Sequence, residues 1–227
     1  NTEKLIAMYV PNVKINQFNY EQEKSSIVLC SPHSGTFLPE EFLSLTKLSL
    51  PEIRQSEDSL VDDLLSFDKK HNNVLISAYW SRGVVDLNRS ANDFNNNDFS
   101  SPIEDFKSNP SRYAYSGLGV IPTRGCHNKK IYEKPIPGEI ANEWIKIAWK
   151  SFHLKLKSIL METKNKYGYN ILLDFHSMPS NFLANKHVDI VLGDCFGKSS
   201  SFKIVKFIRD FFKEKNFKVN LNKPFSG

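Results

Sequence analysis

Short apolar runs alternate along this chain with longer stretches whose apolar residues recur at helical spacing. The apolar runs, which are typical of buried strands, lie at 27–30, 74–78, 83–87, 170–175 and 188–192. The helical patterns lie between them, at 58–70, 139–167 and 201–215. Strands that alternate with helices form a mainly parallel sheet covered on both faces. The pattern therefore predicts an α/β fold, a three-layer α/β/α arrangement around a mixed, mainly parallel sheet.

Length and composition fit one compact domain. The chain has 227 residues, of which 40% are hydrophobic, and single cores stop growing only near ~250–300 residues. We find no internal repeat and no linker, so the sequence predicts a single domain over residues 1–227. No run of ~18 apolar residues is present, which argues against a spanning helix and a membrane partner.

The cysteines and the first residues bear on the compartment. Residues 1–25 lack the charged, apolar and small-residue regions of a secretory signal. Cys30, Cys126 and Cys195 are odd in number and widely spaced, which is not the pattern of a disulfide framework. We therefore expect a reducing, cytoplasmic location.

The formal net charge of +5 raises the question of a nucleic-acid partner. All of this charge arises from residue 200 onward, where the basic residues outnumber Asp210 and Glu214. The basic residues are Lys203, Lys206, Arg209, Lys213, Lys215, Lys218 and Lys223. They alternate with phenylalanine and isoleucine at helical spacing, which is typical of the solvated face of an amphipathic helix. We therefore expect no nucleic-acid partner.

The segment 90–137 has a different composition, rich in Asn, Asp, Ser, Gly and Pro and without a sustained period. It predicts a long loop. Loops of this length inside a compact domain tend to be lids or binding loops, although a surface insertion is nearly as common. The candidates for closing over a ligand, on position alone, are Tyr113, Tyr115, Arg124, His127 and Tyr132.

Polar side chains follow four of the predicted strands at the point where each strand ends. The four strand ends read Ser31-Pro32-His33-Ser34-Gly35, Asp86-Leu87-Asn88-Arg89, Asp174-Phe175-His176-Ser177 and Gly193-Asp194. Ligands of open α/β sheets bind outside the carboxyl ends of the strands. We therefore expect two histidines, an arginine and several carboxylates to converge there.

The two histidines favour a metal site. A single histidine at a strand end is more often a satisfied polar group than a ligand, but His33 and His176 close two strands of one predicted sheet. Asp174, two residues before His176, is placed to hold the second ring nitrogen and to leave the other for a metal. Two histidines, one carboxylate and an open position for water form the ligand set of a catalytic zinc site.

Five ordered segments of the chain resemble the N-formylglutamate amidohydrolase family. They are Pro32-His33-Ser34-Gly35, residues 58–64, Ser81-Arg82 leading into residues 85–89, residues 174–179 and residues 189–194. Members of this family share the zinc-exopeptidase architecture of metallocarboxypeptidases and aspartoacylases. The resemblance runs from about residue 26 to the end and implies a zinc-exopeptidase-like fold.

The resemblance implies that His33 and His176 bind Zn²⁺ and that an acid after His33 is the third ligand. In metallocarboxypeptidases this acid lies three residues after the first histidine, but Thr36 stands there. The family pattern offers Asp58 or Asp62 instead. We favour Asp58, because it precedes the predicted helix whereas Asp62 lies inside it; a role for Asp58 as a helix cap alone remains the alternative.

The Asp-Leu-Asn-Arg segment bears on the substrate. It resembles the segment that grips a substrate carboxylate in aspartoacylases and carboxypeptidases, which implies that Asn88 and Arg89 bind a carboxylate. Arginine pairs with a carboxylate in a bidentate manner and asparagine adds an amide donor. Arg82 resembles the arginine that stabilises the oxyanion of the scissile carbonyl in those relatives. An ion pair between Arg89 and Asp86 or Asp93 is the structural alternative.

Relatives use a glutamate as general base, in a segment that follows one resembling residues 222–227. The resemblance therefore leads us to expect either a further C-terminal segment that carries the glutamate or a protein that lacks it. Asp194, which closes the last predicted strand, is the weaker candidate for the base. We expect Asp194, Asp174 and Asp62 to support the metal ligands through hydrogen bonds.

The resemblance implies a zinc-dependent amidohydrolase that converts N-formylglutamate to glutamate and formate. The substrate class is then a small molecule with a free carboxylate. One alternative is a carboxypeptidase-like enzyme or a hydrolase of another N-acyl amino acid. The other alternative is a catalytically inactive, metal-binding relative. The oligomeric state is not predicted by any of these features.

Overall fold

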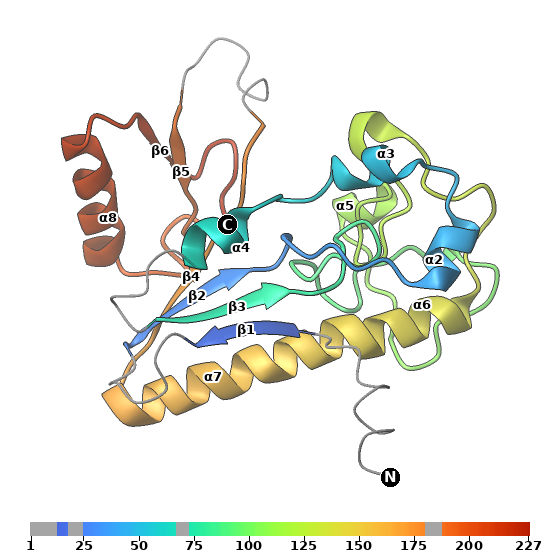
Figure 1. Cartoon of the computed structure of the whole chain (residues 1–227), viewed down its shortest axis with the longest axis horizontal. Helices are drawn as coiled ribbons and strands as arrows, with labels where there is room; N and C mark the ends of the chain where they lie inside the picture. Colours follow the sequence, from blue (N-terminus) through green and yellow to red (C-terminus); the bar gives the residue numbers. More distant parts are fainter. Residues whose placement is uncertain (1–12, 18–24, 67–72, 180–187) are drawn as a thin grey trace. The chain divides into compact units, whose positions relative to one another are not determined.

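The computed structural model describes residues 13–17, 25–66, 73–179 and 188–227. These residues fall into two compact units, the first ending at Ser177 and the second beginning at Met178 (Figure 1). The single domain expected over residues 1–227 stays a prediction.

A mixed, four-stranded sheet lies at the centre of the first unit. Its strands, in the order β1-β3-β2-β4, are β1 (Val13–Gln17), β3 (Val74–Ala78), β2 (Ile27–Ser31) and β4 (Ile171–Asp174). Strand β2 pairs in parallel with both β3 and β4, whereas β1 pairs antiparallel with β3. The mixed, mainly parallel sheet is thus confirmed. The three parallel strands end at one edge of the sheet.

The central strands are buried on both faces. Strand β3 is buried along its whole length, and β2 is buried at all residues after Ile27. Continuous apolar sequence is what a parallel strand covered on both sides requires. The edge strand β4 instead alternates half-buried and exposed residues.

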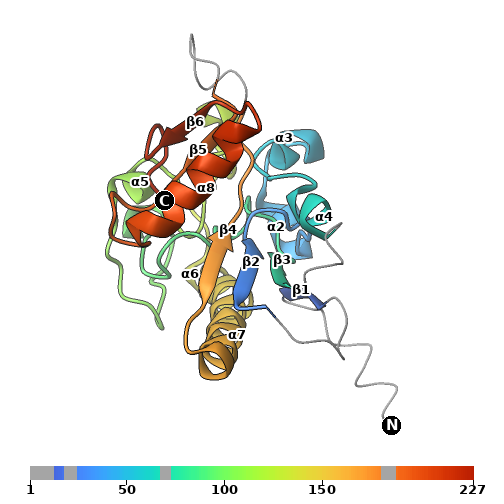
Figure 2. The same ribbon diagram turned by 90° about the vertical axis from the view of Figure 1, so that its left-hand side faces the viewer.

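The long helix predicted over 139–167 forms as three continuous segments, α6 (Gly138–Trp144), the π-helical η3 (Ile145–Lys150) and α7 (Ser151–Tyr167). It ends at Gly168, whose φ of 78° is the left-handed conformation that favours glycine after a helix. Figures 1 and 2 agree that α7 runs along one side of the sheet and that α4 (Val61–Ser66) lies on the other side. The helix predicted at 58–70 begins at Val61 in the structure, three residues later than expected. Residues 67–70 lie outside the described residues.

The strand predicted at 83–87 is wrong. The N–H groups of Val84 and Val85 both donate to the carbonyl of Ser81, at 3.0 and 3.3 Å, so the chain forms turns here. Val84 and Val85 are fully buried and Leu87 is nearly so. The apolar run thus belongs to a loop that passes through the core.

The segment 90–137 contains short structured turns within its loops. They are the 3₁₀ turns η1 (Asn96–Asp98) and η2 (Cys126–Asn128) and the helix α5 (Arg112–Tyr115). Val120, Ile121 and Ile131 are buried in the main core, as is Tyr132. This packing anchors the segment to the first unit, and it excludes Tyr132 from the side chains that close over a ligand. Two further short helices, α2 (Glu40–Leu45) and α3 (Leu50–Arg54), precede α4.

The second unit contains two parallel strands joined through a helix. Strands β5 (Ile190–Leu192) and β6 (Val219–Leu221) pair with each other, in a sheet separate from β1–β4 among the described residues. Helix α8 (Phe202–Glu214) connects them, is capped by Ser201, where the predicted helix begins, and carries most of the basic residues noted above. No helix in the described ranges has the length and apolar content needed to cross a bilayer.

Candidate functional site

His33 lies in the turn that directly follows β2. Its carbonyl accepts a hydrogen bond of 3.0 Å from the N–H of Asp58, which ties this turn to the loop before α4. Gly35 passes so close to the end of β3 that a Cβ there would lie 2.1 Å from the carbonyl oxygen of Trp80. Only glycine fits this approach. His33 is therefore fixed at the edge where the parallel strands end.

His176 and Asp58 meet His33 at this edge. The Oδ2 atom of Asp58 lies 2.9 Å from Nδ1 of His176 and 3.5 Å from Nδ1 of His33. Ser177 donates from its hydroxyl to the other carboxylate oxygen of Asp58, at 2.8 Å. One nitrogen from each histidine and one oxygen of Asp58 lie within 4.8 Å of one another. The structure thus brings together the three residues predicted as metal ligands.

The second ring nitrogen of each histidine faces another carboxylate. Nε2 of His33 is 2.8 Å from Oδ1 of Asp86, and Nε2 of His176 is 3.2 Å from Oδ2 of Asp174. Carboxylates in this position fix the tautomer and the orientation of a ligating histidine. Asp174 therefore lies where the sequence analysis expected it, whereas Asp86 was considered there only as a partner of Arg89.

The Nδ1 atom of His33 is an observation that fits a metal ion. This atom is buried and has no hydrogen-bond partner in the part of the chain that the structure describes. Leaving a buried polar nitrogen without a partner is costly, and Asp86 already occupies Nε2. Together with Oδ2 of Asp58 and Nδ1 of His176, it forms a donor set of two nitrogens and one oxygen that suits zinc.

The hydrogen bonds of the cluster shift its ionisation. Burial raises the pKa of the Asp58 carboxyl, but the hydrogen bonds from His176 and Ser177 and the nearby ring of His33 outweigh burial and hold this pKa well below its usual range. Burial lowers the pKa of His176, but its contacts with Asp174 and Asp58 outweigh burial and raise this pKa to about 9. The Asp58 carboxyl is therefore ionised at neutral pH, which is the state that a metal ligand requires.

Asp86 joins the histidine cluster to two arginines. Its Oδ1 atom faces His33 and also accepts from the backbone N–H of Asn88 at 2.9 Å. Its Oδ2 atom accepts from Nε of Arg82 at 3.1 Å and lies 3.8 Å from Nε of Arg89. Burial raises the pKa of Asp86, but the hydrogen bond to His33 and the charge of Arg82 outweigh it and lower this pKa well below its usual range. One buried carboxylate thus contacts a candidate metal ligand and Arg82, and it lies near Arg89 without a hydrogen bond to it.

We expect Asp86→Asn to weaken zinc binding roughly 10- to 100-fold, because it removes the negative charge that orients His33 while keeping the side-chain size. A competition titration with a zinc-binding dye measures this affinity. Asp105→Asn is the matched control, since Asp105 is an acid that pairs with Lys146 away from the cluster. Zinc affinity equal to that of the wild type in Asp86→Asn would contradict the orienting role.

Side chains of the long helix formed by α6, η3 and α7 hold the backbone of the Asp-Leu-Asn-Arg loop in place. Trp149 donates from Nε1 to the carbonyl of Arg89 at 2.8 Å, and Nε2 of His153 lies 2.8 Å from the carbonyl of Leu87. The amide Nδ2 of Asn88 lies 3.1 Å from Nε2 of His176. Asn88 therefore borders the cluster of His33, Asp58 and His176 in addition to following Asp86.

Asp62 and Asp194 are the other two acids expected to support the metal ligands. Asp62 is in the first turn of α4, whereas Asp58 is the acid that reaches both histidines. Asp194 belongs to the second unit, where it accepts from Nδ2 of Asn222 at 2.7 Å and from the N–H of Gly197 at 3.0 Å. These bonds order the turn after β5. Support of the metal ligands by Asp62 and Asp194 stays a prediction.

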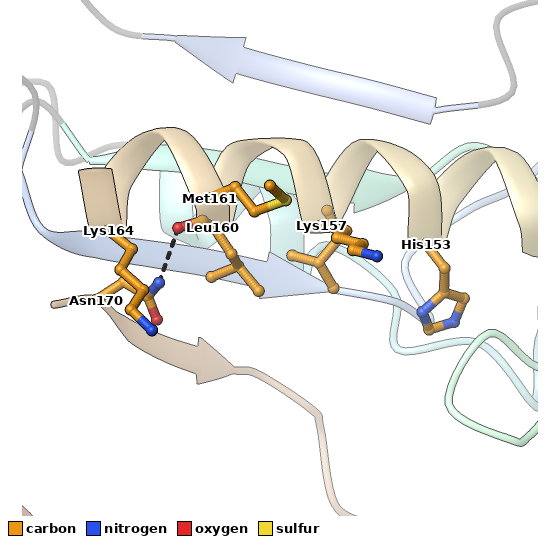
Figure 3. Close-up of a pocket in the computed structure, with 7 residues that line it drawn as sticks. His153, Lys157, Leu160, Met161, Lys164 and Asn170 are labelled. Carbon is orange, nitrogen blue, oxygen red and sulfur yellow. Dashed lines mark hydrogen bonds between the residues drawn. The ribbon is translucent and has the colours of Figure 1, made fainter. Parts of the chain in front are cut away.

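A hollow on the surface of α7 shares no lining residue with this cluster (Figure 3). It has a volume of about 460 Å³ and is lined mainly by aliphatic side chains and lysines. The residues labelled in the figure are His153, Lys157, Leu160, Met161, Lys164 and Asn170. Its lining contains neither a carboxylate nor a cluster histidine. The hollow therefore lacks the donor set found at the strand ends.

Comparison with known proteins gives consistent matches. The sequence model of the N-formylglutamate amidohydrolase family matches residues 25–227. An N-formylglutamate deformylase of Pseudomonas putida is 23% identical over 168 residues, which cover 72% of this chain and 55% of the relative. The chain thus spans about half the length of this curated relative.

Two solved structures are similar in fold. The crystal structure of an N-formylglutamate amidohydrolase from Ralstonia eutropha matches with a TM-score of 0.86 and 25% identity, over 94% of this chain and 78% of that chain. A gene product of Agrobacterium tumefaciens matches with a TM-score of 0.63 and 15% identity, over 94% of this chain and 73% of that chain. The second likeness concerns the fold alone.

Proposed function

Because the chain belongs to the N-formylglutamate amidohydrolase family, we propose that it hydrolyses the amide bond of N-formylglutamate to formate and glutamate, using zinc held by His33, Asp58 and His176. The observation that carries the metal part of this proposal is the buried, unpartnered Nδ1 of His33 beside Oδ2 of Asp58. We also propose that the fold is the three-layer, zinc-exopeptidase-like arrangement, since the site lies at the carboxyl ends of parallel strands.

Zinc bound at this cluster supplies Lewis-acid chemistry for polarising an amide carbonyl. The residues of the chain orient the reaction around it. Asp86 and Asp174 hold the histidine rings through Nε2. Arg82 is anchored to Asp86 through Nε, and its guanidinium donates a hydrogen bond to the carbonyl oxygen, on which negative charge develops.

Arg89 and Asn88 bind the free carboxylate of the substrate. The Arg89 side chain is 23% exposed, so that a solute reaches it, while its backbone is fixed by Trp149. A guanidinium presents two parallel N–H groups to a carboxylate, which gives both affinity and orientation. This requirement for a carboxylate distinguishes the proposed substrate class from simple amides.

The function is tested by measuring formate release from N-formylglutamate, with N-acetylglutamate and a dipeptide as competing substrates. We expect kcat/KM to be highest for N-formylglutamate, and activity to be lost on chelation and restored by added zinc. A preference for the acetyl compound or the dipeptide would instead support the wider class of N-acyl amino acid hydrolases or carboxypeptidases. Zinc-loaded, folded protein without activity on any of them would contradict the proposed hydrolysis.

We expect Arg89→Lys to raise KM for N-formylglutamate roughly 10- to 100-fold, because lysine keeps the charge but loses the paired hydrogen bonds to the carboxylate. Steady-state kinetics at matched zinc occupancy measures this change. Arg209→Lys on α8 is the control and should leave KM unchanged, because Arg209 pairs with Asp210 and is not among the residues assigned to the site. Loss of zinc together with activity in Arg89→Lys would make Arg89 a structural residue.

A further inference from the structure

Tyr113 lies against the arginine to which the proposed function assigns the substrate carboxylate. The centre of its ring is 4.0 Å from Cζ of Arg89, which is the geometry of a cation–π contact. Cζ of Arg112 is 4.9 Å from the same ring centre, and Nη2 of Arg112 donates to the Tyr113 hydroxyl at 3.0 Å. The ring and the hydroxyl of Tyr113 therefore have different partners.

The backbone of Tyr113 is anchored to the interior of the protein. Asp93 is buried, and its two carboxylate oxygens accept from the N–H and the hydroxyl of Ser111, at 2.7 and 3.0 Å. The Ser111 hydroxyl in turn accepts from the N–H of Tyr113 at 3.1 Å, which caps the short helix α5. The tyrosine is thus fixed in place although its side chain borders solvent.

Other groups hold the Arg89 side chain only weakly. Its Nε atom is buried and has no hydrogen-bond partner among the described residues. The nearest carboxylate oxygen, Oδ2 of Asp86, is 3.8 Å away, beyond hydrogen-bond distance. A long side chain that is free to change rotamer loses entropy when it binds a ligand. An aromatic face that fixes the guanidinium plane beforehand reduces this loss.

We propose that Tyr113 is a positioning residue that orients the guanidinium of Arg89 for the substrate carboxylate. The proposal rests on the proposed function of this site and assigns a role to the segment 90–137, which carries the tyrosine. The ring of Tyr113 performs this role, and the hydroxyl, which bonds to Arg112, does not. Tyr113→Leu removes the ring, whereas Tyr113→Phe keeps it.

Kinetics separate the two variants. A cation–π contact at a partly buried site corresponds to roughly 3- to 30-fold in a binding constant. We therefore expect KM for N-formylglutamate to rise by roughly this factor in Tyr113→Leu, with little change in kcat, and to stay at the wild-type value in Tyr113→Phe. An equal rise of KM in both variants, or a KM in Tyr113→Leu equal to that of the wild type, would overturn the proposal.

A second measurement does not depend on the substrate. Phenylglyoxal modifies exposed guanidinium groups, and peptide mass spectrometry locates each modified arginine. We expect Arg89 to react faster in Tyr113→Leu than in the wild type or Tyr113→Phe, while Arg209 reacts equally in all three. Equal reactivity of Arg89 throughout would overturn the positioning role. If the wild type does not hydrolyse N-formylglutamate, the proposed function fails, and the labelling alone decides the role of Tyr113.

Discussion

Replacing either histidine of the cluster with alanine is expected to remove the metal from the protein. His33→Ala and His176→Ala each leave two of the three protein ligands that a catalytic zinc site uses. Zinc content should fall from about one ion per chain to below about a tenth of an ion, and hydrolysis should fall with it. His33→Ala should have the larger effect on folding as well, because His33 is buried whereas His176 is exposed.

Elemental analysis after dialysis measures the zinc content, and circular dichroism shows whether each variant is folded. The control is His127→Asn, which changes an exposed histidine outside the cluster. Asparagine suits this position because His127 has a φ of 56°, in the left-handed region that asparagine tolerates. A folded double variant, His33→Ala with His176→Ala, that keeps its zinc would contradict the metal centre.

Arg82→Ala is expected to lower kcat by roughly 10²- to 10³-fold, the loss typical of removing one donor to a developing oxyanion. KM should change little, because Arg82 is not assigned to the ground-state binding of the carboxylate. Its partner Asp86 would keep its bonds to His33 and to the N–H of Asn88. Metal binding should therefore survive the substitution.

Zinc affinity and steady-state kinetics, measured on the same preparation, separate the two roles of Arg82. Arg209→Ala, which removes an arginine from α8, serves as the control for loss of positive charge. Arg82→Lys is informative because lysine keeps the charge but not the fork that contacts both Asp86 and a carbonyl oxygen. An equal loss of zinc and activity in Arg82→Ala would make this arginine a structural partner of Asp86.

The sequence was sufficient to predict the central strands and the meeting of the two histidines. Strands β2, β3 and β4 lie where apolar runs predicted them; β2 and β3 are buried on both faces and therefore need apolar residues at nearly every position. Strands β2 and β4 are parallel neighbours, so residues that follow them meet at one edge. The convergence of His33 and His176 follows from the pairing of these two strands and does not require other contacts between distant parts of the chain.

The error at 83–87 has a physical reason. A loop that crosses the core must be apolar, just as a buried strand must, and periodicity does not separate the two over five residues. The turn at Ser81 is what distinguishes them, and it is fixed by hydrogen bonds that depend on the folded chain. The role of Asp86 was missed for the same reason, since its contact with His33 depends on where this loop lies. The signal available in the sequence was an acidic residue, Asp86, that directly follows two apolar valines.

Strand β1 was not predicted, and the segment 90–137 was predicted only as a loop. Strand β1 is an antiparallel edge strand, whose place depends on its pairing with β3. The segment 90–137 lacks a period, yet it buries Val120 and Ile131 in the core. Its isolated apolar residues did not reveal this packing, because their spacing follows the shape of the core rather than a helix or a strand.

The π-helical turn between α6 and α7 makes the length of this helix as important as its composition. A π turn holds more residues per turn than an α turn and is often found at functional sites. Each residue of an α-helix advances the side chains by about 100° around the axis. Winding residues 145–150 as an α-helix without removing a residue would therefore rotate α7 against α6 and take Trp149 and His153 away from the carbonyl oxygens of Arg89 and Leu87. We expect the deletion of one residue at this π turn to be absorbed by a change to α-helix, whereas the deletion of one residue elsewhere in α6 or α7 would rotate one end of the helix against the other.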